Sequence, residues 1–262
     1  MARFFSISSG SSGNCYYIGA SGRGLIIDAG ISCKATVSAM ETKDIDINTI
    51  DGVLITHEHN DHIKGLLPLI KKIKCPIYAS KPTLEYISEN IALPENIKTC
   101  EISEETGVGC FKVKPFHTSH DAAFSVGYRF ETPDGRIITH ATDLGYISED
   151  VSNNLSGSDM VILESNYDEN MLKNSFYPVY LKKRIKSNEG HLSNNDCARE
   201  ALKLIKSGTT RFVLAHLSKN NNEPKLAYET TKKIFDENGF IEGRDYALYV
   251  AEEKKPGEMI TL

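Results

Sequence analysis

The sequence predicts an α/β protein in which two sheets pack face to face with helices on the outside. Short β-rich segments alternate with helical patterns along all 262 residues. Each half of the chain, divided near residue 120, begins with strands and ends with helices, and one hairpin shows that antiparallel pairs are present. A chain of this length buries roughly 70 to 75% of its unfolded surface, so metal is not needed for folding. We expect residues 1–262 to form a single domain.

Eleven strands are expected where runs rich in β-branched and aromatic residues are bounded by turn residues. They are Phe4–Ile7, Cys15–Ile18, Gly24–Asp28, Gly52–Thr56, Pro76–Ala79, Cys110–Pro115, Phe124–Glu131, Arg136–His140, Met160–Leu163, Arg211–Ala215 and Tyr246–Val250. Between the seventh and eighth strands, Asp134-Gly135 supplies the positive φ that a tight hairpin turn requires.

Three helices can be placed from their patterns. Apolar residues at helical spacing over Ile63–Lys74 indicate a helix that buries one face against a sheet. Ser193 and Asp196 resemble a capping box, and the helix continues over Ala198–Ile205. A third helix opens at residues 222–224, where a proline stands, and runs to about residue 237.

Composition limits the class of protein. The net charge of −5 and a pI near 5.9 argue against a protein that coats nucleic acid or an anionic membrane through its overall field, although a local basic patch stays open. No apolar run approaches the roughly 18 residues of a membrane span, and the amino terminus lacks a signal-peptide pattern, so we expect a cytoplasmic protein. Six cysteines without a C-x-x-C pair favour free thiols.

The strongest chemical signal is a strand that runs directly into His57-Glu58-His59-Asn60-Asp61-His62. His57 and His59 can point two imidazoles to one side of an extended turn. Asp61 and His62, past the bend, can face a second point nearby. Zinc and similar metals take imidazole nitrogen and carboxylate oxygen, so this spacing predicts a two-metal site.

Four further residues with metal-binding side chains each follow a short apolar strand. They are Asp28, His120, Asp143 and His216. Strand ends are rigid positions along one edge of a sheet, where a preorganised site is best held. A lone residue of this kind is usually a hydrogen-bonded structural residue, but together with the cluster they indicate one site built from several strands.

The His-x-His-x-Asp-His motif with these downstream residues resembles the metallo-β-lactamase superfamily of binuclear hydrolases, over essentially the whole chain. Shorter segments are similar to the YycJ (WalJ) family, regarded as nuclease-like hydrolases that act on DNA. Those segments are Ser8–Asn14, His117–Asp121, Thr142–Tyr146, Glu164–Asp168, Tyr177-Pro178 with Leu181-Lys182, and Gly190–Asn194. The resemblance implies a four-layer αββα sandwich with the site along one edge.

The resemblance also implies seven ligands for two divalent ions, zinc or manganese first, with iron as a further option. One ion would be held by His57, His59 and His120, the other by Asp61, His62 and His216, and Asp143 would bridge both. Asp28 would support the ligand loop by hydrogen bonds instead of binding metal. His117 and His120 compete for one ligand place, and the spacing favours His120.

Two positions near the end of the pattern bear on catalysis. Gly190-His191-Leu192-Ser193 matches a segment of the superfamily's nuclease branches in which the histidine can contact the scissile phosphate or protonate the leaving oxygen. The alternative for His191 is a structural histidine beside a helix N-cap. Tyr167 stands where the YycJ motif often has histidine, which puts an extra metal or substrate contact in doubt.

Two ions held roughly 3.5 to 4 Å apart suit phosphodiester hydrolysis by a bridging hydroxide. We therefore expect a phosphodiesterase, and by resemblance a DNA exonuclease, in which Asp61 orients the hydroxide or accepts its proton and His191 acts as general acid. The same chemistry serves a thioesterase or a lactonase on a small substrate, which is the alternative. A non-catalytic regulator is disfavoured because the whole ligand set is present.

A basic segment precedes His191 and is the best candidate for contact with DNA. Four cations there could attract backbone phosphates, and Tyr177 and Tyr180 could stack on unpaired bases. The cations are Lys182, Lys183, Arg184 and Lys186. The alternative is an amphipathic helix with a solvated basic face. The Ser8–Gly13 loop could offer backbone N–H groups to an anion, or be only a flexible turn.

Overall fold

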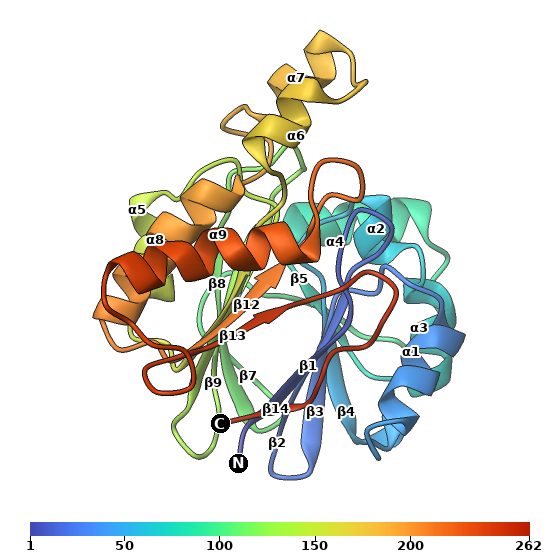
Figure 1. Cartoon of the computed structure of the whole chain (residues 1–262). Helices are drawn as coiled ribbons and strands as arrows, with labels where there is room; N and C mark the ends of the chain where they lie inside the picture. The colour runs from blue at the N-terminus through green and yellow to red at the C-terminus, as the bar shows by residue number, and fades with distance from the viewer.

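The computed structural model describes all 262 residues and shows two seven-stranded sheets packed face to face between helices (Figure 1). The strand order is β14-β1-β2-β3-β4-β5-β6 in the first sheet and β13-β12-β11-β10-β9-β8-β7 in the second. The predicted four-layer αββα sandwich is confirmed. Both chain termini lie together at the end of the sheets opposite the projecting helices α6 and α7 (Figure 1).

The first sheet combines antiparallel and parallel strands. It consists of β1 (Arg3–Ser8), β2 (Cys15–Ala20), β3 (Arg23–Ile27), β4 (Ile50–Leu54), β5 (Ile77–Ala79), β6 (Thr99–Glu101) and β14 (Ile260–Thr261). Pairing is antiparallel from β14 to β3 and parallel from β3 to β6. The carboxyl ends of β3, β4 and β5 therefore lie at one edge.

The second sheet repeats this division. It consists of β7 (Thr106–Val108), β8 (Phe111–His117), β9 (Val126–Glu131), β10 (Ile137–Ala141), β11 (Met160–Glu164), β12 (Arg211–Ala215) and β13 (Ala247–Val250). Pairing is antiparallel from β7 to β10 and parallel from β10 to β13. Its parallel strands β10, β11 and β12 also share one edge for their carboxyl ends.

Helices cover the outer face of each sheet. The first sheet carries α1 (Cys33–Glu41), the 3₁₀ turn η1 (Ile47–Thr49), α2 (Asn60–Ile63), α3 (Leu66–Ile73) and α4 (Lys81–Asn90). The second sheet carries α5 (Glu149–Leu155), α8 (Asn194–Lys206) and α9 (Pro224–Glu237), while α6 (Glu169–Asn174) and α7 (Val179–Ile185) stand away from the body (Figure 1). No helix is both long and apolar enough to span a membrane.

Three apolar clusters hold these layers together. The middle cluster lies between the sheets and includes the buried rings of Phe4, Tyr16, Phe111, Tyr128 and Phe130. The outer clusters join α1, α3 and α4 to the first sheet and α5, α8 and α9 to the second. Strands buried on both faces explain why the sequence shows short apolar runs in place of strict alternation. All six cysteines are free.

The predicted strands all appear, and three very short ones, β6, β7 and β14, were not predicted. The division near residue 120 is wrong, because β7 and β8 belong to the second sheet and β14 returns to the first. The predicted helix Ile63–Lys74 is α3, which begins three residues later than predicted, at Leu66. Gly65 precedes it and separates it from α2; its N–H donates to the Ala29 carbonyl (2.8 Å), and a Cβ there would collide with the Ile31 carbonyl.

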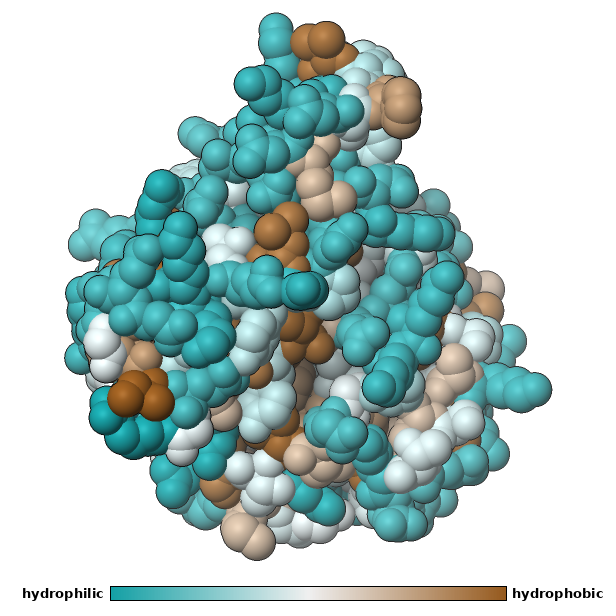
Figure 2. Space-filling view, in the orientation of Figure 1, coloured by the Kyte–Doolittle hydropathy of each residue, from teal (hydrophilic) through white to brown (hydrophobic).

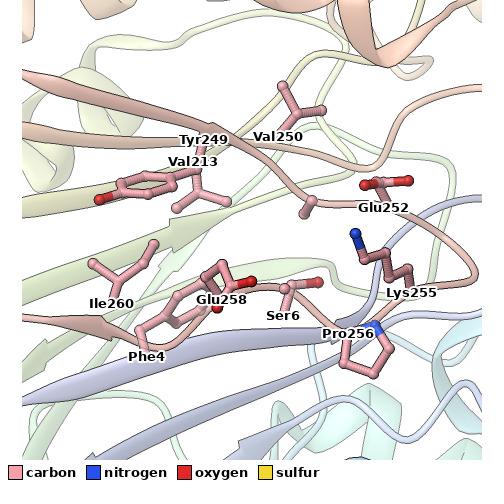
Figure 3. A pocket seen from close by; sticks show the side chains of 12 residues that line it. Phe4, Ser6, Val213, Tyr249, Val250, Glu252, Lys255, Pro256, Glu258 and Ile260 are labelled. Atoms are coloured by element: carbon pink, nitrogen blue, oxygen red, sulfur yellow. The ribbon is translucent and has the colours of Figure 1, made fainter. Parts of the chain in front are cut away.

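The segment between β13 and β14 closes the gap between the two sheets. Residues of this segment line a cavity of about 150 Å³. Figure 3 shows the side chains around it, with Phe4, Val213 and Ile260 on its apolar walls. The segment is tied to β1, because the Gly257 N–H donates to the Ser6 carbonyl (2.8 Å). None of the predicted ligand residues lines this cavity.

Candidate metal centre

The predicted ligands converge where the parallel strands of both sheets end. Potential ligand atoms lie within 4.8 Å of one another in four overlapping groups. The groups are His57, His59 and His120; Asp61, His62 and His216; His57, His62 and Asp143; and Asp143, Glu164, His191 and His216. The first two groups are the two ligand sets that the sequence predicted, and Asp143 touches both sides, with its oxygens 3.3 Å from His62 Nε2 and 3.7 Å from His120 Nε2.

Three residues of the site follow strand ends in a left-handed backbone conformation. Asp28, Asp143 and His216 have φ values of 60°, 56° and 54°. This conformation costs about 1 to 3 kcal/mol for a residue other than glycine and persists only where the surroundings impose it. At these strand ends it turns the chain sharply, so that the side chains are held at the edge of the sheets.

Asp28 holds one of the predicted ligands from behind. Its buried carboxylate lies 2.7 Å from His62 Nδ1 and accepts a hydrogen bond from the Thr56 N–H (2.8 Å). Burial raises the pKa of Asp28, although the contact with His62 opposes this. With Nδ1 taken by Asp28, His62 presents Nε2 to the cluster, which is how a carboxylate commonly orients a metal-binding histidine.

The cluster has the chemical properties that a divalent metal requires. His57 Nε2, Asp143 Oδ2 and His216 Nε2 are buried and have no hydrogen-bond partner, which is rare for buried polar atoms. Burial lowers the pKa of His57 and of His120, which keeps both imidazoles neutral and able to donate a lone pair. These residues therefore fit zinc, manganese or iron.

The carboxylates of the cluster are ionised. Burial by itself would raise the pKa of Asp61 and of Asp143, but neighbouring histidines, His216 and His62 foremost, hold both well below the usual range. Burial would lower the pKa of His62, but Asp28 and Asp143 raise it to about 10. A metal that binds at His62 must therefore displace a proton.

Glu164 is a buried residue of the site that the ligand prediction missed. Its Oε1 lies 2.9 Å from His191 Nδ1 and 2.8 Å from His216 Nδ1, and its Oε2 accepts from the backbone N–H groups of Leu144 and Leu192 (3.1 and 3.0 Å). Burial raises its pKa, but His191 and His216 hold the value below normal. The sequence did contain a signal for Glu164: it stands at the end of an apolar strand, as Asp28 and His216 do.

Asn14 is a second missed residue. Its Oδ1 accepts from the Gly10 N–H (2.9 Å) and the Tyr16 hydroxyl (3.3 Å), so its Nδ2 must face the cluster. There Nδ2 lies 3.3 Å from Asp61 Oδ2 and 3.0 Å from His62 Nε2. Only its place in the Ser8–Asn14 segment marked it in the sequence.

The comparisons with known proteins agree with this architecture. Residues 23–217 match the β-lactamase superfamily domain. The chain is 35% identical over 256 residues to exodeoxyribonuclease YycJ of Bacillus anthracis, covering 97% of this chain and 96% of that one. It is 32% identical over 249 residues to exodeoxyribonuclease WalJ of Streptococcus pneumoniae, covering 93% and 91%.

The chain belongs to the YycJ/WalJ family of the metallo-β-lactamase superfamily. Zn²⁺-bound PqqB from Methylobacterium extorquens has the same fold, with a TM-score of 0.73 at 17% identity and full coverage of both chains. Membership of this superfamily, together with the cluster of histidines and aspartates, makes the chain a metal-dependent hydrolase.

In this YycJ/WalJ-family chain, His117, His140 and Tyr167 lie outside the groups of potential ligands. His117 is exposed, 5.0 Å from the Phe124 ring between ring centroids, so His120 and not His117 lies in the cluster. His140 is buried, and its ring centroid lies 4.7 Å from that of Tyr16. Tyr167 is buried, and its backbone forms a β-bridge with Ser193, two residues after His191.

The serine-rich loop of this family member supports a ligand. Ser9 Oγ accepts from the His216 N–H (2.7 Å). Ser8 Oγ lies 2.7 Å from the carbonyl oxygens of both Gly13 and Glu253, which share its one hydroxyl proton. Ser8 and Ser9 are buried. The first half of the loop therefore fixes the backbone at His216, and the flexible-turn alternative is wrong for these two residues.

The basic segment forms part of an arm, residues 169–186, that comprises α6 and α7 and projects from the body (Figure 1). In α7, Leu181 and Ile185 are partly buried, while Lys183 and Arg184 are exposed, which fits the alternative of an amphipathic helix with a solvated basic face. Contact of this segment with DNA stays a prediction. Lys182 Nζ donates to the carbonyls of Lys173 and Ser175 (2.8 and 2.7 Å), which ties α7 to the carboxyl end of α6. Figure 2 shows hydrophobic residues at its tip, where Phe176 is fully exposed.

Arg184 joins the arm to the metal centre. Its Nε donates to Asp121 Oδ2 (2.6 Å). The other oxygen of Asp121 lies 3.4 Å from His120 Nε2, and its carbonyl lies 3.2 Å from His59 Nε2. One cation of the arm therefore stands beside the predicted ligands, while Lys183 and Lys186 are exposed to solvent.

Proposed function

We propose that the chain is a binuclear phosphodiesterase that degrades DNA as an exonuclease. The observation that carries this proposal is the joining of two three-residue ligand sets through Asp143, beside the Glu164–His191 pair. Relatives named as exodeoxyribonucleases match nearly the whole chain and support the substrate class. Three-histidine and two-histidine-one-carboxylate sets are suited to zinc, manganese or iron.

Each ligand set has a proposed ion. His57, His59 and His120 would hold one, and Asp61, His62 and His216 the other, with Asp143 shared between them. When bound, two such ions lower the pKa of a shared water to give a hydroxide nucleophile and polarise the phosphoryl oxygen under attack.

The protein's own groups would supply the proton transfers. Asp61 is ionised and a quarter exposed, so its carboxylate can orient the hydroxide or accept its proton. His191 is one fifth exposed, and its Nδ1 is engaged by Glu164. Its Nε2 edge is left to donate a proton to the leaving oxygen, which makes His191 the proposed general acid.

The arm would contact the DNA. Lys183 and Lys186 are free to bind backbone phosphates, while Lys182 and Arg184 have hydrogen-bond partners within the protein and would add charge. Tyr180 is largely exposed and could stack on an unpaired base, whereas the Tyr177 hydroxyl accepts from Asn220 Nδ2 (2.8 Å).

The thioesterase or lactonase alternative has less support. Such an enzyme would be favoured by an apolar acyl pocket with no cation near the metals. A cation does lie near the predicted ligands: Arg184 pairs with Asp121, whose other carboxylate oxygen is 3.4 Å from Nε2 of His120. A cation at this place suits an anionic phosphodiester.

The proposal is tested with purified protein, manganese or zinc, and end-labelled DNA. The wild type should release nucleotides, and Asp61→Ala, Asp143→Ala and His216→Ala should each reduce the rate by about 10²-fold or more while the circular dichroism spectrum stays folded. Asp236→Ala, on the exposed face of α9, is the matched control and should retain the rate. Robust cutting by the three site variants would overturn the assignment, and a thioester panel run in parallel tests the alternative.

A further inference from the structure

A second cavity is joined to the metal centre by a shared loop, and none of the predicted ligands lines it. It has a volume of about 440 Å³, within the range of small-molecule sites. The loop 118–125, which joins β8 to β9, carries His120 into the metal centre and places Phe124 on the wall of the cavity. We call this cavity the loop cavity.

The loop cavity has an aromatic wall and an apolar floor. Phe124 and His117 lie with their ring centroids 5.0 Å apart and their planes tilted by 53°. Phe124 is 43% exposed, one of three exposed aromatic rings outside the arm, with Tyr86 and Tyr146. Ile102 and Val126, both buried, also line the cavity. A flat ring could therefore stack on Phe124 with its far edge directed inward.

Polar side chains complete the lining. Lys81 at the start of α4 offers a donor, and the carboxylates of Glu101 and Asp150 offer acceptors. The edge of a nucleobase carries both donors and acceptors, whereas an acyl chain carries neither. The mixture of aromatic, apolar and polar groups favours a base as the occupant.

Glu58 fixes the cavity relative to the metal centre. It stands between the ligands His57 and His59, and its Oε1 accepts from the Ala123 N–H (2.6 Å). Its Oε2 accepts from the Thr83 hydroxyl on α4 (3.4 Å), and Ser80 Oγ donates to the Phe124 carbonyl (3.1 Å). The ligand motif, the loop and α4 are thus joined through one side chain and its neighbours.

We propose that the loop cavity binds the base of a nucleotide next to the scissile phosphate, with the base stacked on Phe124. The proposal rests on the proposed function, since it requires a phosphodiester at the metal centre. It assigns a role to Glu58, the middle residue of the His-x-His motif: this side chain would set the distance between the phosphate at the metal centre and the base in the cavity. It also assigns Phe124 as a residue that determines substrate preference.

The first test compares single-stranded oligonucleotides whose terminal nucleotides are either complete or abasic. Stacking of one base on an aromatic side chain is worth about 5- to 150-fold, so the wild type should degrade the complete strand faster by at least the lower figure. In Phe124→Ala this preference should fall toward one, and Phe124→Tyr should restore it. Tyr86→Ala removes a ring of similar exposure on α4, outside the cavity lining, and should keep the preference.

The second test measures binding without catalysis. The chain contains no tryptophan, so Phe124→Trp introduces a single one at the cavity, which can be excited at wavelengths where the twelve tyrosines do not absorb. Deoxyadenosine 5′-monophosphate, titrated in the presence of Zn²⁺, should quench its fluorescence in a saturable way. Phe176→Trp at the tip of the arm should show no saturable change.

The outcomes separate the two proposals. If the wild type degrades neither strand, the proposed function fails. If it degrades DNA but Phe124→Ala keeps the preference for complete nucleotides, or Phe124→Trp is not quenched, the base site is overturned while the exonuclease assignment stands.

Discussion

Asp28, Asp143 and His216 show how single residues build this site. Each follows an apolar strand, and each adopts a positive φ that few residues other than glycine tolerate. Aspartate and histidine are both found in this region more often than most residues other than glycine. At His216 the hydrogen bond from the backbone N–H to Ser9 Oγ helps to stabilise the conformation.

The support that Asp28 gives to His62 leads to a first prediction. Asp28→Asn keeps the size of the side chain and tolerates the same φ, but it puts an amide in place of the buried carboxylate that pairs with His62 Nδ1. We expect metal affinity to fall about 10- to 100-fold, as measured by competition with a chromophoric chelator. Asp44→Asn, at a remote residue with φ 54°, is the control. Unchanged affinity in Asp28→Asn would show that the carboxylate does not orient the ligand.

Glu164 leads to a second prediction, which concerns the leaving group. Glu164→Gln replaces the carboxylate that His191 and His216 share. His191, the proposed general acid, should then protonate the leaving oxygen more slowly. We expect kcat on DNA to fall about 10²-fold in Glu164→Gln and in His191→Ala. The loss should be much smaller on thymidine 5′-phosphate p-nitrophenyl ester, whose leaving group needs no proton. Equal losses on both substrates would mean that the pair acts only through the structure of the site.

At the scale of elements, the sequence predicted what is local and missed what is distant. The His57–His62 motif could be interpreted because its ligands are contiguous after β4, and the 132–135 turn because Asp-Gly encodes it. Glu164 and Asn14 act through partners up to 52 residues away along the chain, and no local pattern records these contacts. The later start of α3 was missed for the same reason, since Gly65, which precedes the helix, packs against residues 29–31.

The arm leads to a third prediction. Lys183→Ala combined with Lys186→Ala removes two exposed cations, and each phosphate contact to a single strand contributes about 0.7 to the slope of log K against log salt. We expect weaker binding of a labelled oligonucleotide and a slope reduced by about 1.4, measured by fluorescence anisotropy in EDTA to prevent cleavage. Lys71→Ala combined with Lys72→Ala on α3 should leave the slope unchanged. An unaltered slope in the arm variant would remove the arm from the DNA interface.

At the scale of the whole molecule, the net charge does not predict the electrostatic field at the metal centre. A net charge of −5 suggests that the protein repels DNA. The ionised Asp61 and Asp143, however, belong to the cluster that would hold two divalent ions, and Arg184 stands beside it. The local field that a phosphate meets is therefore set by the bound ions and the arm, and not by the overall excess of acidic residues.

The last prediction follows from the buried atoms that have no partner. His57 Nε2, Asp143 Oδ2 and His216 Nε2 leave the metal-free fold with unsatisfied polar groups, so bound metal should stabilise the folded state. At 100 times Kd the gain is about 2.7 kcal/mol, which for a chain of this size raises Tm by roughly 5 to 11 °C. Differential scanning fluorimetry of chelator-treated protein with added Zn²⁺ measures the shift.

The pH dependence and the stoichiometry of this effect are also fixed by the site. Without metal the pKa of His62 is about 10. Burial would lower the pKa of His216, but Asp143 and Asp61 raise it, so protons compete with the metal at both ligands. Binding releases protons, and the gain in Tm at a fixed concentration of metal should shrink as the pH falls. Asp143→Ala should lose most of the gain, while Asp236→Ala keeps it. A full gain in Asp143→Ala, or one ion per chain by metal analysis, would contradict a shared two-ion centre, because Asp143 is the residue that touches both ligand sets.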